Sequence, residues 1–261
     1  MITVPNISRY KAASIHLAIS AGIAALVLSL MLAVWYPPPL FDAMGGKELV
    51  LLVVGVDVTI GPLITLIIFD TRKKELLFDL AIVATLQLAA LGYGVYAMQS
   101  GRPVFIVFVE NQFAVVSAAE LEPEAIAQAR WPEFRTLPLT GPKWAVADMP
   151  TDPKELSDIT FARLAGLGAQ NLPRYYAPYA ERRSLVLAHS MPFNISGNLP
   201  AEFVAEIERT LLRTGQGPNN VRWLPVTTKQ ATLTALIDGE SGEIISIAAI
   251  GPPALGDQRT H

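Results

Sequence analysis

Residues 49–69 read LVLLVVGVDVTIGPLITLIIF, and Asp57 is the one charged side chain among these 21 residues. As an α-helix with a rise of about 1.5 Å per residue, the run is roughly 32 Å long, which matches the roughly 30 Å hydrocarbon core of a bilayer. Two further runs, Ile15–Trp35 and Leu80–Met98, contain no Lys, Arg, Asp or Glu. The sequence therefore predicts a membrane protein with three transmembrane α-helices within residues 1–100.

The remainder of the chain has a different composition. Residues 1–100 contain six basic and six acidic residues, whereas residues 101–261 contain fourteen and seventeen. The second segment is long enough for one domain with its own core. The net charge of −3 predicts no nucleic-acid surface, and the absence of cysteine excludes disulfides and cysteine nucleophiles.

Lys and Arg in the short flanking segments predict the orientation of the three helices. Their numbers alternate along the chain as two, one, three and one: Arg9 and Lys11, then Lys47, then Arg72, Lys73 and Lys74, then Arg102. The N-terminus and the second loop are therefore expected in the cytoplasm. Residues 101–261 are expected on the opposite side of the membrane, as an extracytoplasmic (periplasmic) domain.

The pattern of residues 101–261 is typical of an α+β domain. An apolar run, a polar turn at 110–112 and a second apolar run predict a hairpin of strands 102–109 and 113–117. Ser117 and Glu120 form a capping-box pattern that opens a helix to about Arg130. Further elements are expected as a strand at 144–149, helices near 152–164 (capped by Thr151 or Asp152), 179–188 and 199–213, and strands at 228–238 and 243–250 around a glycine turn.

Asp57 is the candidate site within the apolar helices. It lies eight residues into its run, about 12 Å from the outer end, where a carboxylate costs roughly 2.5–3.5 kcal/mol. Thr59 and Gln87 are the candidate hydrogen-bond partners, whereas His16 is expected to lie too deep to reach it. Three interpretations stay open: a neutral acid bonded across helices, a docking point for a partner helix, and, least favoured, a proton or ion pathway.

Two neighbouring residues of Asp57 and three tyrosines complete the candidate partner contacts. Gly61 and Pro62 allow close approach of another helix and a local break in the second span. Tyr175, Tyr176 and Tyr179 form either a contact patch or ordinary packing. No nucleophile motif, phosphate loop or metal-ligand spacing is visible. We therefore expect no catalytic residue, no cofactor and no metal.

The order and spacing of motifs across the first hundred residues resemble the TfpX/TfpZ family of type IV pilin accessory proteins. The motifs are SRYKAASIHL at 8–17, VWYPPPLF at 34–41, GVDVTIGPLITLIIF at 55–69, KKELLFDL at 73–80, LQLAALGYGVY at 86–96 and RPV at 102–104. The resemblance is weaker beyond them and extends only in layout through the last hundred residues.

This resemblance implies a multi-pass protein of the bacterial inner membrane. It implies a chaperone-like, non-enzymatic role in the stability or assembly of a cognate major type IV pilin, with other pilus assembly proteins and membrane lipid as further partners. We expect Asp57, Thr59 and Gln87 to receive polar groups of the pilin helix, and external strand edges or the tyrosines to meet the pilin head.

The main alternative is a membrane-anchored sensor or regulator with a periplasmic ligand-binding domain. It is disfavoured because the cytoplasmic segments, about fourteen residues and a loop of about ten, are too short for a catalytic output. A membrane enzyme is less favoured still, because it would need several acids or a Ser/His/Lys set near the membrane surface and only Asp57 and Asp42 qualify. A transporter is the least favoured, with three spans and one buried charge.

Overall fold

The computed structural model describes residues 7–150, 152–164, 168–194 and 199–253. It divides into two compact units. The first unit consists of residues 1–36 and 45–100, and the second of residues 37–44 and 101–261. The short loop between the first two long helices thus belongs to the second unit.

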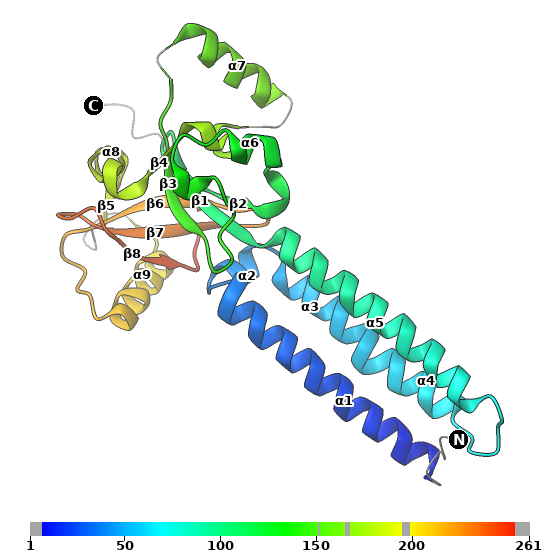
Figure 1. The fold of residues 1–261 in the computed structure, drawn as a ribbon. Helices are drawn as coiled ribbons and strands as arrows, with labels where there is room; N and C mark the ends of the chain where they lie inside the picture. Colours follow the sequence, from blue (N-terminus) through cyan, green and yellow to red (C-terminus); the bar gives the residue numbers. More distant parts are fainter. Residues whose placement is uncertain (1–6, 151, 165–167, 195–198, 254–261) are drawn as a thin grey trace. The chain divides into compact units, whose positions relative to one another are not determined.

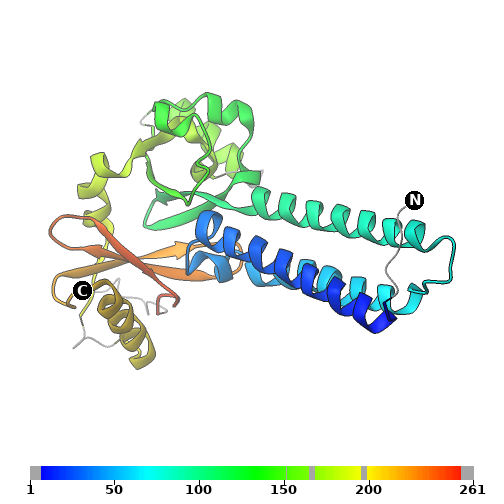
Figure 2. The ribbon, with the colours of Figure 1, turned by 60° about the horizontal axis from the view of Figure 1, so that its bottom comes forward.

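The first unit consists of three long apolar helices (Figures 1 and 2). The first is α1 (Arg9–Leu30) with a π-helical end, η1 (Met31–Trp35). The second is α3 (Gly46–Val54), a π-helical segment η2 (Gly55–Ile60) and α4 (Gly61–Ile68), and the third is α5 (Leu76–Gly101). Each is long and apolar enough to cross a membrane, which confirms the predicted helices. Their insertion into a membrane stays a prediction.

The ends of the first helix follow from local chemistry. The Ser8 hydroxyl accepts a hydrogen bond from the Lys11 N–H at 3.3 Å, and caps the helix start. Three consecutive prolines after Tyr36 prevent the helix from continuing. The Tyr36 hydroxyl donates to the Met98 carbonyl at 2.8 Å and so joins the end of the first helix to the end of α5.

The second unit is built on one mixed sheet of eight strands in the order β4-β3-β1-β2-β6-β7-β8, with β5 paired to β6. The strands are β1 (Pro103–Val109), β2 (Gln112–Ser117), β3 (Lys143–Ala147), β4 (Tyr176–Pro178), β5 (Met191–Pro192), β6 (Val221–Thr227), β7 (Thr232–Asp238) and β8 (Ile244–Ala248). β1 pairs parallel with β3, and β2 pairs parallel with β6; the other pairs are antiparallel.

Helices and turns connect these strands. They are α2 (Leu40–Ala43), η3 (Ala118–Glu120), α6 (Pro123–Ala127), η4 (Pro132–Phe134), α7 (Pro153–Leu164), η5 (Ala169–Asn171), η6 (Pro173–Tyr175), η7 (Tyr179–Arg182), α8 (Arg183–His189) and α9 (Ala201–Thr214). Helix α9 buries Phe203, Ile207 and Leu211 and ends at Gly215, which has φ of 72°. This helix confirms the helix predicted at 199–213.

Among the described residues of the second unit, apolar side chains gather in two cores. The first gathers around β1, where Phe105 packs edge-on against Phe134 and Tyr176. The second lies between α9 and strands β6 to β8, where Phe203 and Trp223 have ring centroids 5.4 Å apart. Every residue of β1 is buried, so the strand that follows α5 is a central element of the domain.

The structure corrects two sequence predictions. The capping box is present, with the Ser117 N–H donating to Glu120 at 3.3 Å, but its helix ends after three residues. Glu122 is extended because a residue before proline disfavours the helical region, and α6 begins anew at Pro123. Strand β6 was not predicted. Thr151, one of the two expected caps of α7, lies outside the described residues.

Candidate functional site

Asp57 lies in the π-helical segment η2 and is buried, with 7% of the residue exposed. It lines a cavity of about 190 Å³ together with His16 and Ser20 of α1 and Gln87 of α5. Its carboxylate oxygen Oδ1 is buried and has no hydrogen-bond partner among the described residues. A buried, unpaired acceptor is costly, so this oxygen is chemically suited to receive a donor.

The main chain around Asp57 is irregular because of Pro62. The Gly61 N–H donates to the carbonyl of Val56, five residues earlier, and proline has no N–H. Neither Gly61 nor Pro62 therefore serves the Asp57 carbonyl. The Gln87 side-chain amide donates to that carbonyl at 3.2 Å and replaces the missing helical bond.

Gly61 gives the Gln87 side chain its space. A Cβ atom on residue 61 would lie 2.0 Å from the Gln87 amide nitrogen, far inside contact distance. A Cβ atom there would force the flexible end of the Gln87 side chain to move, whereas the backbone conformation does not call for glycine, since Gly61 has helical φ and ψ. Gly61, Pro62 and Gln87 together form one structural arrangement that holds Asp57 in place.

His16 is a polar neighbour that the sequence analysis excluded. Its Nδ1 lies 2.6 Å from the Thr65 hydroxyl, which joins α1 to α4. His16 lines the Asp57 cavity and also an adjacent cavity of about 290 Å³ between α1, α4 and α5. The sequence feature that could have predicted this shared cavity is that His16 and Asp57 are both isolated polar residues within apolar runs.

The predicted partners of Asp57 are placed differently from expectation. Gln87 donates its side-chain amide to the main-chain carbonyl of Asp57 rather than to the carboxylate. Thr59 is exposed. Gly61 and Pro62 are buried beside the site. The contact roles of all these residues stay predictions.

The three predicted tyrosines do not share one exposed surface. Tyr176 is 1% exposed and donates its hydroxyl to the Gln170 carbonyl, and Tyr179 is 8% exposed and donates to the Gly242 carbonyl at 2.7 Å. Burial raises the pKa of both hydroxyl groups, so they remain neutral donors. Tyr175 is half-buried and lines a cavity of about 850 Å³.

Within the described residues, no group of three or more His, Asp or Glu side chains is placed to hold a metal ion. The polar arrangement around Asp57 and the mixed-sheet unit describe a class of protein: three apolar helices with an internal polar site, joined to a folded α+β domain.

Comparison with known proteins identifies the family. A family model described as fimbrial assembly protein FimB matches residues 6–45. A fimbrial assembly protein of serogroups C1 and C2 from Dichelobacter nodosus is 36% identical over 121 residues, which cover 46% of this chain and 92% of the relative. The chain therefore belongs to the FimB family of fimbrial assembly proteins, and the resemblance to pilin accessory proteins is confirmed.

Two further relatives from Dichelobacter nodosus are longer. The fimbrial assembly protein of serogroup I is 38% identical and that of serogroup E1 is 35% identical, each over 133 residues. These alignments cover 50% of this chain and 51% of each relative, so the chain spans about half the length of these relatives. No solved structure matches the chain significantly.

Proposed function

We propose that this protein is an inner-membrane accessory protein of type IV pilus biogenesis that binds a cognate major pilin and supports its stability or assembly. Binding is chaperone-like and involves no chemistry. The N-terminus lies in the cytoplasm and residues 101–261 in the periplasm, as the basic residues of the flanks indicate. The family of fimbrial assembly proteins supports this role.

Exposure of the apolar helices supports a membrane location. Only 17%, 25% and 11% of the most apolar windows of the three helices are buried within the protein. Large side chains such as Leu26, Leu51 and Leu86 are at least 66% exposed. In lipid these surfaces are solvated by acyl chains, whereas in water they would expose a large continuous apolar area.

The observation that carries the proposal is the buried, unpaired carboxylate oxygen of Asp57. Lipid tails are as apolar as leucine, so apolar matching cannot drive helices together in a membrane, and polar groups and small residues must contribute. A partner helix that brings a hydrogen-bond donor to Asp57 removes the cost of the unpaired oxygen. The Gln87 amide and the His16 ring each already contact another group of this chain.

Deleting the gene and measuring total and surface pilin together tests the function. Reduced total pilin means that the protein protects unassembled subunits, and normal total but reduced surface pilin means a role in assembly. If both quantities are unchanged, the proposed function is wrong.

Variants of Asp57 test the docking site. We expect Asp57→Ala to reduce the pilin that co-purifies with the full-length protein by about 3- to 18-fold, the range given by roughly 0.6–1.7 kcal/mol for a polar contact between membrane helices. Asp57→Asn keeps an acceptor oxygen and is expected to retain part of the binding. Asp57→Glu keeps the charge and tests its position.

Asp79→Asn is the matched control, because Asp79 lies in the first turn of α5 and pairs with Lys73 at 3.7 Å. It also removes a carboxylate from the helical unit, but away from the cavity. Unchanged co-purification and piliation in Asp57→Ala would rule out docking at Asp57.

A further inference from the structure

Strand β8 forms one end of the sheet, and among the described residues no strand pairs with its outer edge. Its residues are uncharged: Ile244, Ile245, Ser246, Ile247 and Ala248. Natural proteins commonly protect an edge with lysine, proline or a very short strand, because unpaired N–H and C=O groups pair readily with another chain. A bulge at Ile245 is the irregular feature of this edge.

The strand at the opposite end of the sheet, β4, has features that protect an edge from pairing with another chain. Strand β4 has only three residues and ends at Pro178, which has no N–H to offer. Of the two strand edges at the ends of the sheet, β8 is therefore the one open to a partner strand.

A groove of about 610 Å³ follows the edge of β8. Five consecutive residues, 243–247, line it, together with Ile106 of β1, Trp144 of β3 and the proline-containing segment at residues 37–40. Ligand sites are typically about 300–1,000 Å³. Five consecutive strand residues span roughly 17 Å, which is the length of backbone that an added strand of five residues would need.

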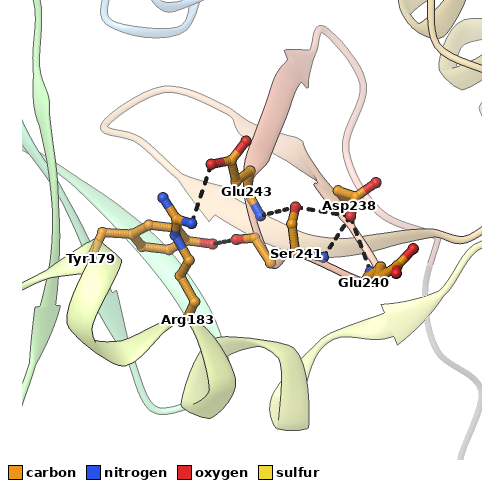
Figure 3. Close-up of polar contacts among 7 residues, drawn as sticks. Tyr179, Arg183, Asp238, Glu240, Ser241 and Glu243 are labelled. Atoms are coloured by element: carbon orange, nitrogen blue, oxygen red, sulfur yellow. Dashed lines mark hydrogen bonds and ion pairs between the residues drawn. The ribbon is translucent and has the colours of Figure 1, made fainter.

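The turn that leads into β8 is held rigidly by residues of η7 and α8 (Figure 3). The Tyr179 hydroxyl donates to the Gly242 carbonyl at 2.7 Å, and Arg183 Nη1 lies 3.2 Å from Glu243 Oε1. Gly242 has φ of +70°, and a Cβ atom there would lie 3.0 Å from Arg183 Cβ. A pre-formed edge binds a partner strand with a smaller entropy cost.

Arg183 adds a charged group to the groove. Its Nε is buried and has no hydrogen-bond partner among the described residues, although its Nη1 pairs with Glu243. The buried Nε is closed to a bound chain, but the side chain is 37% exposed and a guanidinium has five N–H donors, so its exposed N–H groups can donate to an oxygen of a bound chain. The groove thus combines an open backbone edge, apolar side chains and one donor at the β8 start.

We infer that this groove binds an extended, largely apolar polypeptide segment that adds as a strand to β8 and offers an oxygen acceptor, preferably a carboxylate, to Arg183. The inference rests on the proposed function, because it takes the extended segment to belong to the periplasmic head of the cognate pilin. Main-chain hydrogen bonds along β8 would give affinity, and Arg183 would fix the register.

The test uses the full-length protein and the full-length cognate major pilin, co-expressed in a host without other pilus proteins. A photo-crosslinking side chain replaces Ser246 in one variant and Glu124, an exposed residue of α6, in the control. We expect a crosslink from position 246 to one extended pilin segment and at least a tenfold weaker signal from position 124. Hydrogen exchange at residues 244–248 should slow at least tenfold when pilin is bound.

Two lysine variants test the same inference if the crosslinking side chain at position 246 disturbs the fold of β8. Ser246→Lys places a charge on the edge and should reduce the exchange protection at least threefold. Ser184→Lys makes the same change at an exposed position of α8 that does not line the groove, and should leave it unchanged.

The failures are distinguishable. If pilin co-purifies but neither crosslinks at position 246 nor protects residues 244–248, the groove inference is overturned and the proposed function stands. If pilin does not co-purify and the deletion leaves pilin unchanged, the proposed function fails and the inference fails with it.

Discussion

The amide nitrogen of Gln87 lies 2.0 Å from the point that a Cβ atom on Gly61 would occupy. Helices α4 and α5 therefore approach each other closely at Gly61 and Gln87, because residue 61 has no side chain. The contact also places the amide within 3.2 Å of the Asp57 carbonyl. The Gln87 side chain thus occupies the space left by the absent side chain of Gly61, and its amide supplies the hydrogen bond that Pro62, without an N–H, cannot give to the Asp57 carbonyl.

Gly61→Ala should displace the flexible end of the Gln87 side chain and destabilise the helical unit by about 0.5–1.5 kcal/mol, the net value of the hydrogen bond to the Asp57 carbonyl that is lost. The measurement is the unfolding of the purified protein in detergent by titration with a denaturing detergent. Gly92→Ala is the control, because nothing lies within 4 Å of a Cβ atom there. Gly61→Ala and Gln87→Ala together should cost less than the sum of the two single changes, because both remove the same hydrogen bond, and a purely additive result would contradict this explanation.

Pro62 and Gln87 should be energetically coupled. Pro62→Ala restores an N–H that can reach the Asp57 carbonyl, so Gln87→Ala should then cost less than in the natural sequence. We expect a coupling energy of about 0.5–1.5 kcal/mol, the net value of one hydrogen bond, from a double-mutant cycle. A coupling near zero would mean that the carbonyl does not depend on Gln87.

Tyr179→Phe should destabilise the second unit by about 1–3 kcal/mol, because the buried Gly242 carbonyl loses its donor. Burial raises the pKa of the Tyr179 hydroxyl above its ordinary value of about 10. Its contribution is therefore complete below pH 10 and is lost as the pH rises further. The free energy of unfolding should fall less steeply above pH 10 in Tyr179→Phe, and equal slopes would contradict this assignment.

Asp238 should make the β7–β8 hairpin sensitive to acid. Its Oδ1 accepts hydrogen bonds from the N–H of Ser241 at 2.7 Å, from the Ser241 hydroxyl at 2.9 Å and from the N–H of Glu240 at 3.0 Å. The Ser241 main-chain and side-chain donors hold the pKa of Asp238 below its ordinary range. Its stabilisation is thus present above about pH 4 and is lost as the pH falls below it.

The measurement for Asp238 is the unfolding of the protein between pH 6 and pH 2.5. Asp238→Asn should remove part of the loss of stability over this range. Ser241→Ala should have a smaller effect in the same direction, since it removes one of the donors. An unchanged pH profile in Asp238→Asn would refute the role of this carboxylate.

The presence and approximate positions of the three long helices were predictable from sequence, because they depend on composition along a single segment. The residues around Asp57 were not, because depth in the helix says nothing of the direction in which a side chain points around it. Two residues turn a helix by about 200°, so Thr59 leaves the face on which Asp57 lies. His16 was excluded on depth, although it lines the same cavity.

In the second unit, the hairpin was predictable and the pairing of distant strands was not. The hairpin at 102–117 follows from two apolar runs separated by turn residues. Strand β6 contains Pro225, which argues against a central strand. In the structure, β5 pairs at residues 222–223 and β2 at 226–227, so Pro225 falls in the gap between two partners. The residues around Pro225 do not indicate where β2 and β5, each more than thirty residues away in sequence, will pair with β6.

Residues 37–44 have a consequence for how the domain is made. They group with the second unit, where the Thr228 hydroxyl donates to the Ala43 carbonyl at 2.6 Å. During translation, residues 37–44 are synthesised long before residues 101–261. The second unit can therefore complete its fold only after residues 101–261 have been added to this earlier segment, which joins the first two long helices in the sequence. A soluble fragment that starts at residue 101 would lack a native part of its own fold, and a faithful fragment must carry residues 37–44 as a grafted segment.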